Sequence, residues 1–241
     1  MSEHSSGVSR WTPRGLSRSI PALEQLATPL WDRYRHGALG PYLNRARGIP
    51  GWLGMAESIA VARAVLALPP DPTVVEVGSF LGRSTVVIGG ALAVRGDGVV
   101  HCIDPFDGLG EDYSASVYEE IRATSDRSLR RRFDDNIGRA GLTDLVRVHA
   151  GTVETVGPDW TEPFDLLFLD GDQSVAGAHR AFALLSPFLR PGGVLALHNS
   201  KDREYAPDHD GHRQIVVRDL PLGGWSPVFT VETTSFARRT G

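Results

Sequence analysis

The sequence predicts a doubly wound α/β domain built on a mostly parallel, seven-stranded sheet. From about Gly54 onward, short apolar strands alternate with segments of helical period. The strands are near-continuous runs of β-branched and apolar residues, which is typical of a sheet covered by helices on both faces. The composition, 41% hydrophobic and 22% charged over 241 residues, is that of one globular domain with a short N-terminal extension.

The first half of the domain begins with an Ala-rich segment, residues 55–68. Its apolar side chains recur at three- and four-residue steps, and Pro69-Pro70 ends the predicted helix. The elements expected next are strand 74–77, helix 84–93, strand 99–103, helix 125–139 and strand 146–150.

The second half continues the alternation and ends on a hairpin. Its expected elements are strand 164–169, helix 175–188, strand 194–198, helix 213–220 and a terminal pair of strands within 228–239. Residues 1–50 show a mixed pattern with scattered Pro and Gly. We expect them to form a partly disordered extension with short helices, either a lid or a dimer contact, ahead of the main domain at 51–241.

Charge and composition exclude several classes of partner. The net charge is −4 and the 25 basic residues are not gathered into one stripe, so duplex nucleic acid is not expected to bind. No apolar run approaches the roughly 18 residues that a membrane span needs, and the polar N-terminus is not a signal peptide. The single cysteine, Cys102, fits a reducing cytoplasm. A small molecule is the expected partner, and the sequence leaves a homodimer or larger homo-oligomer open.

The ligand of such a sheet is expected beyond the carboxyl ends of its strands. After the first strand, Gly78 and Gly82 allow a sharp turn and a close approach of the ligand to the backbone. The helix that follows offers free N–H groups to a carboxylate, and Ser84 adds a hydroxyl. Glu76 would repel a pyrophosphate but suits an ammonium group. The turn therefore favours an amino acid over a dinucleotide, although a turn without a ligand has the same glycines.

Two further strand ends fit a nucleoside. Asp104 ends the second strand, where a carboxylate can accept both ribose hydroxyls, although it could also only cap its own turn. Gly151 and Thr152 follow the third strand, where a small residue admits the edge of an adenine. An amino acid joined to a nucleoside describes S-adenosylmethionine.

Four segments carry a resemblance to a known family. VVEVGSFLGRST (74–85), HCIDPFDG (101–108), FDLLFLDGDQS (164–174) and RPGGVLALHNS (190–200) are similar to motifs of the class I S-adenosylmethionine-dependent methyltransferases. The chain most resembles the small O-methyltransferases that include catechol O-methyltransferase and the macrocin-type sugar O-methyltransferases. The resemblance implies a Rossmann-like methyltransferase fold. It also implies methyl transfer to a hydroxyl of a small molecule, a sugar or polyhydroxylated natural product.

Carried over position by position, the resemblance implies a cofactor site. The methionine end of the cofactor, the ribose and the adenine would each contact one strand end. The implied residues are Glu76 and Gly78 at the ammonium group, Ser79 and Phe80 beside it, Ser84 at the carboxylate, Asp104 at the ribose, Gly151 and Thr152 at the adenine, and Asp170 at the reacting end.

The resemblance also implies a metal and a base. Asp170 would bind a divalent cation together with His198 and Asn199, and Asp172 would serve as the general base. His198 and Asn199 depart from the family, which commonly has carboxylates there, and Mg²⁺ prefers oxygen ligands. The imidazole therefore leaves three cases open: Mg²⁺, a softer ion, or no metal with His198 as the base.

Two other functions remain open from the sequence. One is a metal-independent N-methyltransferase, and the other is a catalytically silent partner subunit that keeps the nucleoside pocket. The cluster His209, Asp210 and His212 is expected to be a solvated loop near the rim of the substrate site.

Overall fold

The computed structural model describes residues 36–109, 112–201, 205–206 and 209–241. Within these residues a single seven-stranded sheet has the order β3-β2-β1-β4-β5-β7-β6. The first five strands are parallel, whereas β7 pairs antiparallel with β5 and with β6. The strands are β1 (Thr73–Val77), β2 (Val99–Asp104), β3 (Val146–Ala150), β4 (Phe164–Leu169), β5 (Leu189–Leu197), β6 (Phe229–Val231) and β7 (Thr234–Arg238). The predicted fold class is confirmed.

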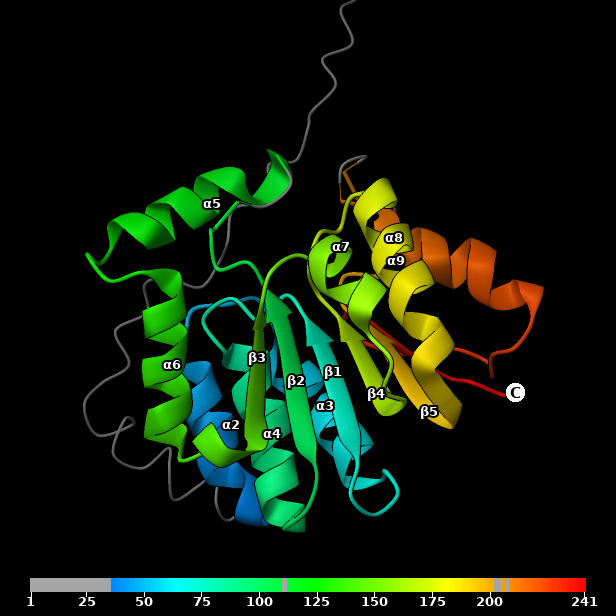
Figure 1. Cartoon of the computed structure of the whole chain (residues 1–241), viewed down its shortest axis with the longest axis horizontal. Helices are drawn as coiled ribbons and strands as arrows, with labels where there is room; N and C mark the ends of the chain where they lie inside the picture. Colours follow the sequence, from blue (N-terminus) through cyan, green and yellow to red (C-terminus); the bar gives the residue numbers. More distant parts are fainter. Residues whose placement is uncertain (1–35, 110–111, 202–204, 207–208) are drawn as a thin grey trace, which may run out of the picture.

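Helices cover both faces of the sheet and enclose two separate apolar cores (Figure 1). One core lies under α2 (Gly40–Arg47), α3 (Met55–Leu66), α4 (Arg83–Arg95) and α6 (Leu129–Ala140). The other lies under α7 (Val153–Val156), α8 (Val175–Leu185) and the π-helical turn η5 (Ile215–Asp219) that follows α9 (Gly211–Gln214). Because strands β1, β2, β4 and β5 are apolar on both sides, each face of the sheet can bury its own core.

Helix α2 is an integral part of the first core. Its residues Leu43 and Ala46 are buried, and Gly90 of α4 lies so close to Tyr42 that a Cβ on Gly90 would be 2.4 Å from the tyrosine ring. The part of the extension that the structure describes therefore packs on the sheet domain. The predicted roles of residues 1–35, as a lid or a dimer contact, lie outside the described residues.

Several element boundaries differ from the predicted ones. Helix α6 begins at Leu129 rather than at residue 125, because the Ser128 hydroxyl caps it by accepting from the backbone N–H of Arg131. Strand β5 begins at Leu189, and η4 (Ser186–Phe188) completes the segment after α8. Helix α5 (Asp112–Ala123) was not predicted.

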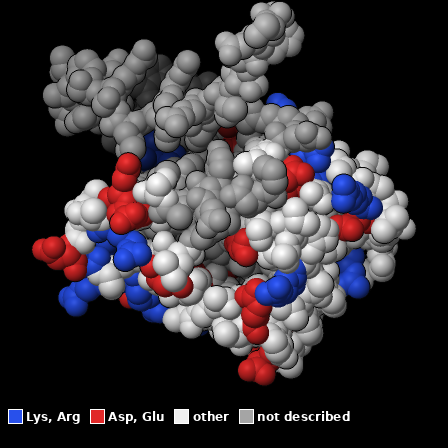
Figure 2. Space-filling model, turned by 90° about the horizontal axis from the view of Figure 1, so that it is seen from above, with Lys and Arg blue, Asp and Glu red and all other residues white. Residues whose placement is uncertain are grey.

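Basic and acidic side chains are mixed on the described part of the face in Figure 2, where blue and red side chains are interspersed rather than separated. On helix α6 the arginine run is paired, with Arg130 bonded to Asp134 four residues on. In the part of the chain that the structure describes, no helix is both long and apolar enough to cross a bilayer.

Candidate active site

The site lies where the chain changes direction in the sheet. From β1 the chain builds outward through β2 and β3, and then returns to place β4 on the other side of β1. The ends of β1 and β4 are therefore adjacent, and the Asp170 N–H donates to the Val77 carbonyl at 2.9 Å. This reversal is where doubly wound sheets bind their ligands.

The glycine turn after β1 depends on the absence of a side chain at Gly78. Gly78 has φ +86°, and a Cβ there would lie 2.4 Å from the carbonyl oxygen of Asp170. Gly82, with φ +87°, is the N-cap of α4. Phe80 between them also has a positive φ, +47°, a strained value for a bulky residue and one that clusters at ligand sites.

Glu76 lies beneath this turn and is fully buried. Its Oε2 accepts from the Ser79 hydroxyl at 2.7 Å, from the Thr85 hydroxyl at 2.5 Å and from the thiol of Cys102 at 3.3 Å. Burial raises the pKa of Glu76, and the hydroxyl donors only partly offset this. All of these donors are neutral, so the negative charge has no cationic side chain to balance it among the described residues.

Asp104 lies beside the same turn, at the end of β2. Its two carboxylate oxygens accept from the backbone N–H groups of Phe80, at 2.7 Å, and Phe106, at 2.6 Å. Burial raises the pKa of Asp104 as well, against these backbone bonds. Each oxygen keeps a further lone pair, so the carboxylate that holds the turn can still accept hydroxyl groups from a ligand.

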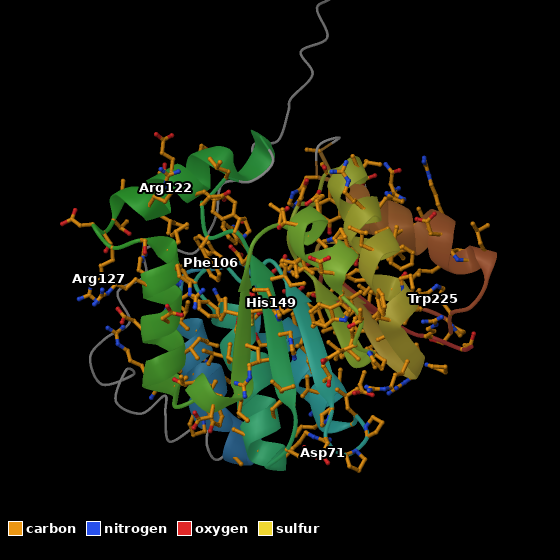
Figure 3. All side chains as sticks on the ribbon, in the orientation of Figure 1. Asp71, Phe106, Arg122, Arg127, His149 and Trp225 are labelled. Atoms are coloured by element: carbon orange, nitrogen blue, oxygen red, sulfur yellow. The ribbon has the colours of Figure 1, made fainter. Side chains whose placement is uncertain are left out.

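The remaining cofactor candidates border the same end of the sheet. The Gly151 N–H donates to the Asp104 carbonyl at 3.1 Å, and Thr152 is exposed as the N-cap of α7. Ser84 is buried in the first turn of α4. Phe106, labelled in Figure 3, packs against Phe133 with the two rings tilted, and the Arg130 guanidinium lies 5.4 Å from the centroid of the Phe106 ring. The structure therefore brings the predicted cofactor residues to one edge.

A small cavity opens between this turn and the segment before α3. Pro50 to Leu53 form one wall, and Gly78 to Leu81 with Arg83, Ser84 and Asp170 form the other. Trp52, Phe80 and Tyr118 of α5 pack together over it, with ring centroids 5.0 to 5.8 Å apart. Trp52 and Arg83 were not among the predicted site residues, although Trp52 is large and 39% exposed.

At the ends of β4 and β5, Asp170 and His198 form a second polar group beside the turn. His198 Nδ1 lies 2.7 Å from Asp170 Oδ1, and its Nε2 faces Glu57 Oε1 at 3.7 Å. Burial alone would lower the pKa of His198, but the two carboxylates outweigh it and raise the pKa. His198 is 2% exposed, so its imidazole is buried between the two carboxylates.

Glu57, from α3, was not predicted to belong to the site. Its Oε1 accepts from the Thr233 N–H and from the hydroxyls of Thr233 and Thr234, and its Oε2 accepts from the Gly54 N–H. Burial opposes its ionisation, yet His198 and these bonds lower the pKa of Glu57. In the sequence Glu57 has the pattern of an N3 residue that bonds back to its helix start, which gives no signal of a second role.

The neighbours of His198 correct one expectation. His209, Asp210 and His212 are buried rather than solvated. His212 Nδ1 bonds to the His198 carbonyl at 2.7 Å, and burial lowers the pKa of His212 to about 4, so it is a neutral donor. Asn199 contacts His209 through Nδ2, at 3.2 Å from Nε2.

Comparison with known proteins decides the family. Residues 75–200, more than half of the chain, match the family model described as a methyltransferase domain. The chain belongs to this methyltransferase family. The resemblance to class I S-adenosylmethionine-dependent methyltransferases is confirmed, and with it the prediction of an enzyme that takes S-adenosylmethionine.

Solved structures with the same fold support this assignment. The methyltransferase is similar to the O-methyltransferase TomG from Streptomyces achromogenes, solved with SAM, at 18% identity and TM-score 0.58 over 90% of this chain and 99% of that one. It is similar to an O-methyltransferase from Bacillus cereus in complex with SAH, at 18% identity and TM-score 0.57 over 89% and 99%. The O-methyltransferase NovP matches at 18% identity and TM-score 0.61 over 78% and 81%.

The donor set of this methyltransferase does not fit the Mg²⁺ site that the resemblance implied. Asp170 is the one carboxylate of the three predicted ligands, and its Oδ1 already accepts from His198 Nδ1 and from Gln173 Nε2, at 3.1 Å. Asn199 is directed to His209. Mg²⁺ requires an octahedron of oxygen ligands, which one occupied carboxylate and an amide do not supply.

Asp172, the predicted base of the methyltransferase, lies at the entrance to α8. It is exposed, and its Oδ1 accepts from the backbone N–H of Ser174 at 2.9 Å. This bond is the helix-entry role that such an aspartate commonly has. Its role as a base stays a prediction.

Proposed function

We propose that this methyltransferase transfers a methyl group from S-adenosylmethionine to a hydroxyl of a small polyhydroxylated molecule such as a sugar. The observation that carries the proposal is the pair of buried acids, Glu76 and Asp104, held at the glycine turn by neutral donors alone. A buried negative charge without a partner is costly. A ligand with a positive charge and several hydroxyls removes that cost.

Different residues of the site bind different parts of the cofactor. Asp104 accepts the ribose hydroxyls, and Gly151 and Thr152 border the adenine. The N-terminus of α4, with Ser84, receives the carboxylate, because its free N–H groups and dipole favour an anion. Glu76, through Ser79 and Gly78, sets the negative potential at the ammonium group.

The reaction itself is a direct displacement. A lone pair of the acceptor oxygen attacks the sulfonium methyl, a C–O bond forms, the C–S bond breaks, and S-adenosylhomocysteine leaves. The acceptor hydroxyl must lose its proton to a base, and the site must hold donor and acceptor in line. Trp52 and Phe80 line the cavity and pack with Tyr118, and we expect this aromatic cluster to limit the access of water to the sulfonium.

Oxygen as the acceptor atom is supported by the neighbours in structure, because TomG, NovP and the Bacillus cereus protein are each described as O-methyltransferases. A sugar or polyhydroxylated natural product is supported by the sequence motifs shared with the macrocin-type enzymes. Ser79, Ser84 and Asp170 supply polar groups in the wall of the cavity, which suits hydroxyl groups.

Calorimetric titration with S-adenosylhomocysteine tests the cofactor site. We expect micromolar binding by the wild type and a loss of about 100-fold in affinity for Asp104→Ala, since bonds to a charged acceptor are worth roughly 1.5–3 kcal/mol. Asp107→Ala, an exposed aspartate on the same segment, is the matched control and should bind as the wild type does. A wild type that does not bind would refute the proposal.

The acceptor is tested by mass spectrometry of products from a panel of sugars and polyphenols, with primary amines of similar size alongside. We expect methylated hydroxyls and unmodified amines. Methylation confined to the amines would assign the enzyme to nitrogen instead.

A further inference from the structure

The acceptor end of the site contains a charge arrangement that the cofactor does not explain. We infer that the His198 side chain, held between Asp170 and Glu57, takes the place of a divalent cation at this site, so that methyl transfer proceeds without a metal. The inference rests on the proposed function for the transfer step, but the position of His198 can be tested without it.

Three separate elements converge to hold His198. Asp170 follows β4, His198 follows β5, and Glu57 comes from α3. The backbone keeps His198 next to Asp170, because its N–H donates to the Leu169 carbonyl at 3.1 Å. The β6–β7 turn fixes Glu57 through the two hydroxyls of Thr233 and Thr234. The imidazole thus has little freedom to rotate away.

The ring nitrogens explain why no metal is needed. Nδ1 lies 2.7 Å from Asp170 Oδ1 and Nε2 lies 3.7 Å from Glu57 Oε1; the ring is 2% exposed and is not among the residues that line the cavity, so it offers no lone pair there. A metal ligand or a general base needs such a lone pair. Instead the ring occupies Asp170 Oδ1, the carboxylate oxygen that a divalent ion would need, together with Gln173, while Asn199 is directed to His209.

Asp170 is then the group that meets the acceptor. Its Oδ1 is occupied by His198 and Gln173, whereas its Oδ2 has no hydrogen-bond donor among the described residues. Asp170 also lines the cavity beside the glycine turn. We assign Asp170 Oδ2 as the base that takes the proton of the acceptor hydroxyl. The O–H bond breaks as the acceptor oxygen forms its bond to the methyl carbon. His198 and Glu57 are positioning residues, since they act on Asp170 and not on the substrate.

The test measures Mn²⁺ binding by electron paramagnetic resonance. The protein is first saturated with S-adenosylhomocysteine. The wild type should leave Mn²⁺ free in solution. His198→Asp removes the cation and joins a third carboxylate to Asp170 and Glu57, so it should bind Mn²⁺ at least tenfold more tightly. Asn199→Asp adds the same carboxylate one residue along while keeping the imidazole, and should behave as the wild type does.

Three outcomes would overturn the inference. One is stoichiometric Mn²⁺ binding by the wild type. Another is equal binding by His198→Asp and Asn199→Asp, which would mean that an added charge, and not the removal of the imidazole, creates the site. The third is an absence of binding by every variant, which would mean that His198 does not occupy a cation position. Circular dichroism and S-adenosylhomocysteine titration establish that each variant is folded.

A second measurement uses the wild type alone. Product formation after dialysis against a chelator should equal that of the untreated enzyme, and added Mg²⁺ should not raise it. A rate lost on chelation and restored by Mg²⁺ would overturn the inference even if His198→Asp failed to fold. If no product forms but S-adenosylhomocysteine binds, the acceptor part of the proposed function fails while the Mn²⁺ result still decides the position of His198.

Discussion

The two ends of the site hold their acids in opposite ways. At the cofactor end, Glu76 and Asp104 are bonded only to hydroxyl, thiol and backbone N–H donors, and burial raises the pKa of both. At the acceptor end, Glu57 faces the buried His198, and its pKa is lowered despite burial. The acids at the cofactor end therefore have no cationic partner among the described residues, whereas those at the acceptor end face the imidazole of His198.

This difference indicates which end of the site is suited to bind a cationic ligand. Coulomb energies are large away from water, so a site that lacks a positive partner gains most from a positive ligand. S-adenosylmethionine brings a sulfonium and an ammonium to the cofactor end. At the acceptor end the His198 imidazole already lies between Asp170 and Glu57, which leaves Asp170 Oδ2 to act on a neutral hydroxyl.

The largest effect is expected from Gly78→Ala at the cofactor end. A Cβ would lie 2.4 Å from the Asp170 carbonyl, and the positive φ adds strain, so we expect a loss of about 3 kcal/mol or more in the free energy of unfolding and no cofactor binding. Urea unfolding and calorimetry measure both quantities.

Gly96→Ala is the control for this change. Gly96 has nearly the same φ, +83°, but no atom within 4 Å of a built Cβ, so only the roughly 1 kcal/mol of left-handed strain should appear. Equal losses for the two variants would mean that the close approach of β1 and β4 is unimportant.

Glu57→Gln at the acceptor end should have the next largest effect. It leaves His198 with one carboxylate instead of two, and breaking a buried ion pair costs roughly 3 kcal/mol. Glu154→Gln breaks an exposed pair with Arg180 and should cost less than about 1 kcal/mol. Urea unfolding near neutral pH compares them, and a cost for Glu57→Gln no greater than that for Glu154→Gln would contradict the ion pair.

The smallest effect concerns two histidines that form no ion pair among the described residues, although Glu162 partly offsets the lowering of their pKa. His101 and His149 stack across β2 and β3, with Nδ1 and Nε2 2.9 Å apart (His149 is labelled in Figure 3). Burial lowers the pKa of both rings, and His149 lowers that of His101 further. They should therefore be neutral in the folded protein where His198 is charged.

The sign of the pH effect follows from proton uptake. Below the ordinary histidine pKa, about 6.5, the unfolded chain binds protons that the folded rings exclude, so these rings make stability fall as the pH falls, until their folded pKa is reached. His149→Phe should reduce that fall by up to about 1 kcal/mol while keeping the packing on Trp160. Urea unfolding at a series of pH values below about 6.5 measures this fall in the free energy of unfolding, with the values near pH 8 as the reference. The same dependence of stability on pH in His149→Phe and in the wild type would contradict the neutral histidine pair.

Much of the cofactor end could be predicted from the sequence because its signals are local. Glu76, Gly78 and Ser84 belong to one short segment, and Asp104 follows the next strand. The parallel order of the strands then brings these ends together without any detailed packing. Helix α5 was not predicted although Tyr113, Val117 and Ile121 recur at four-residue steps, and the start of α6 depended on whether Ser125 or Ser128 served as the cap.

The sequence by itself therefore determined the fold class and the family, since both depend on patterns of strand, turn and helix along the chain; its assignment of residues to the cofactor stays a prediction. Only the tertiary structure decided the acceptor end. Glu57 lies far from His198 along the chain and resembles an ordinary helix-start glutamate, and Asp170, His198 and Asn199 form a metal site or an ion pair according to where their side chains point. The direction of those side chains is set by α3 and the β6–β7 turn, through contacts between residues distant in sequence that no local pattern records.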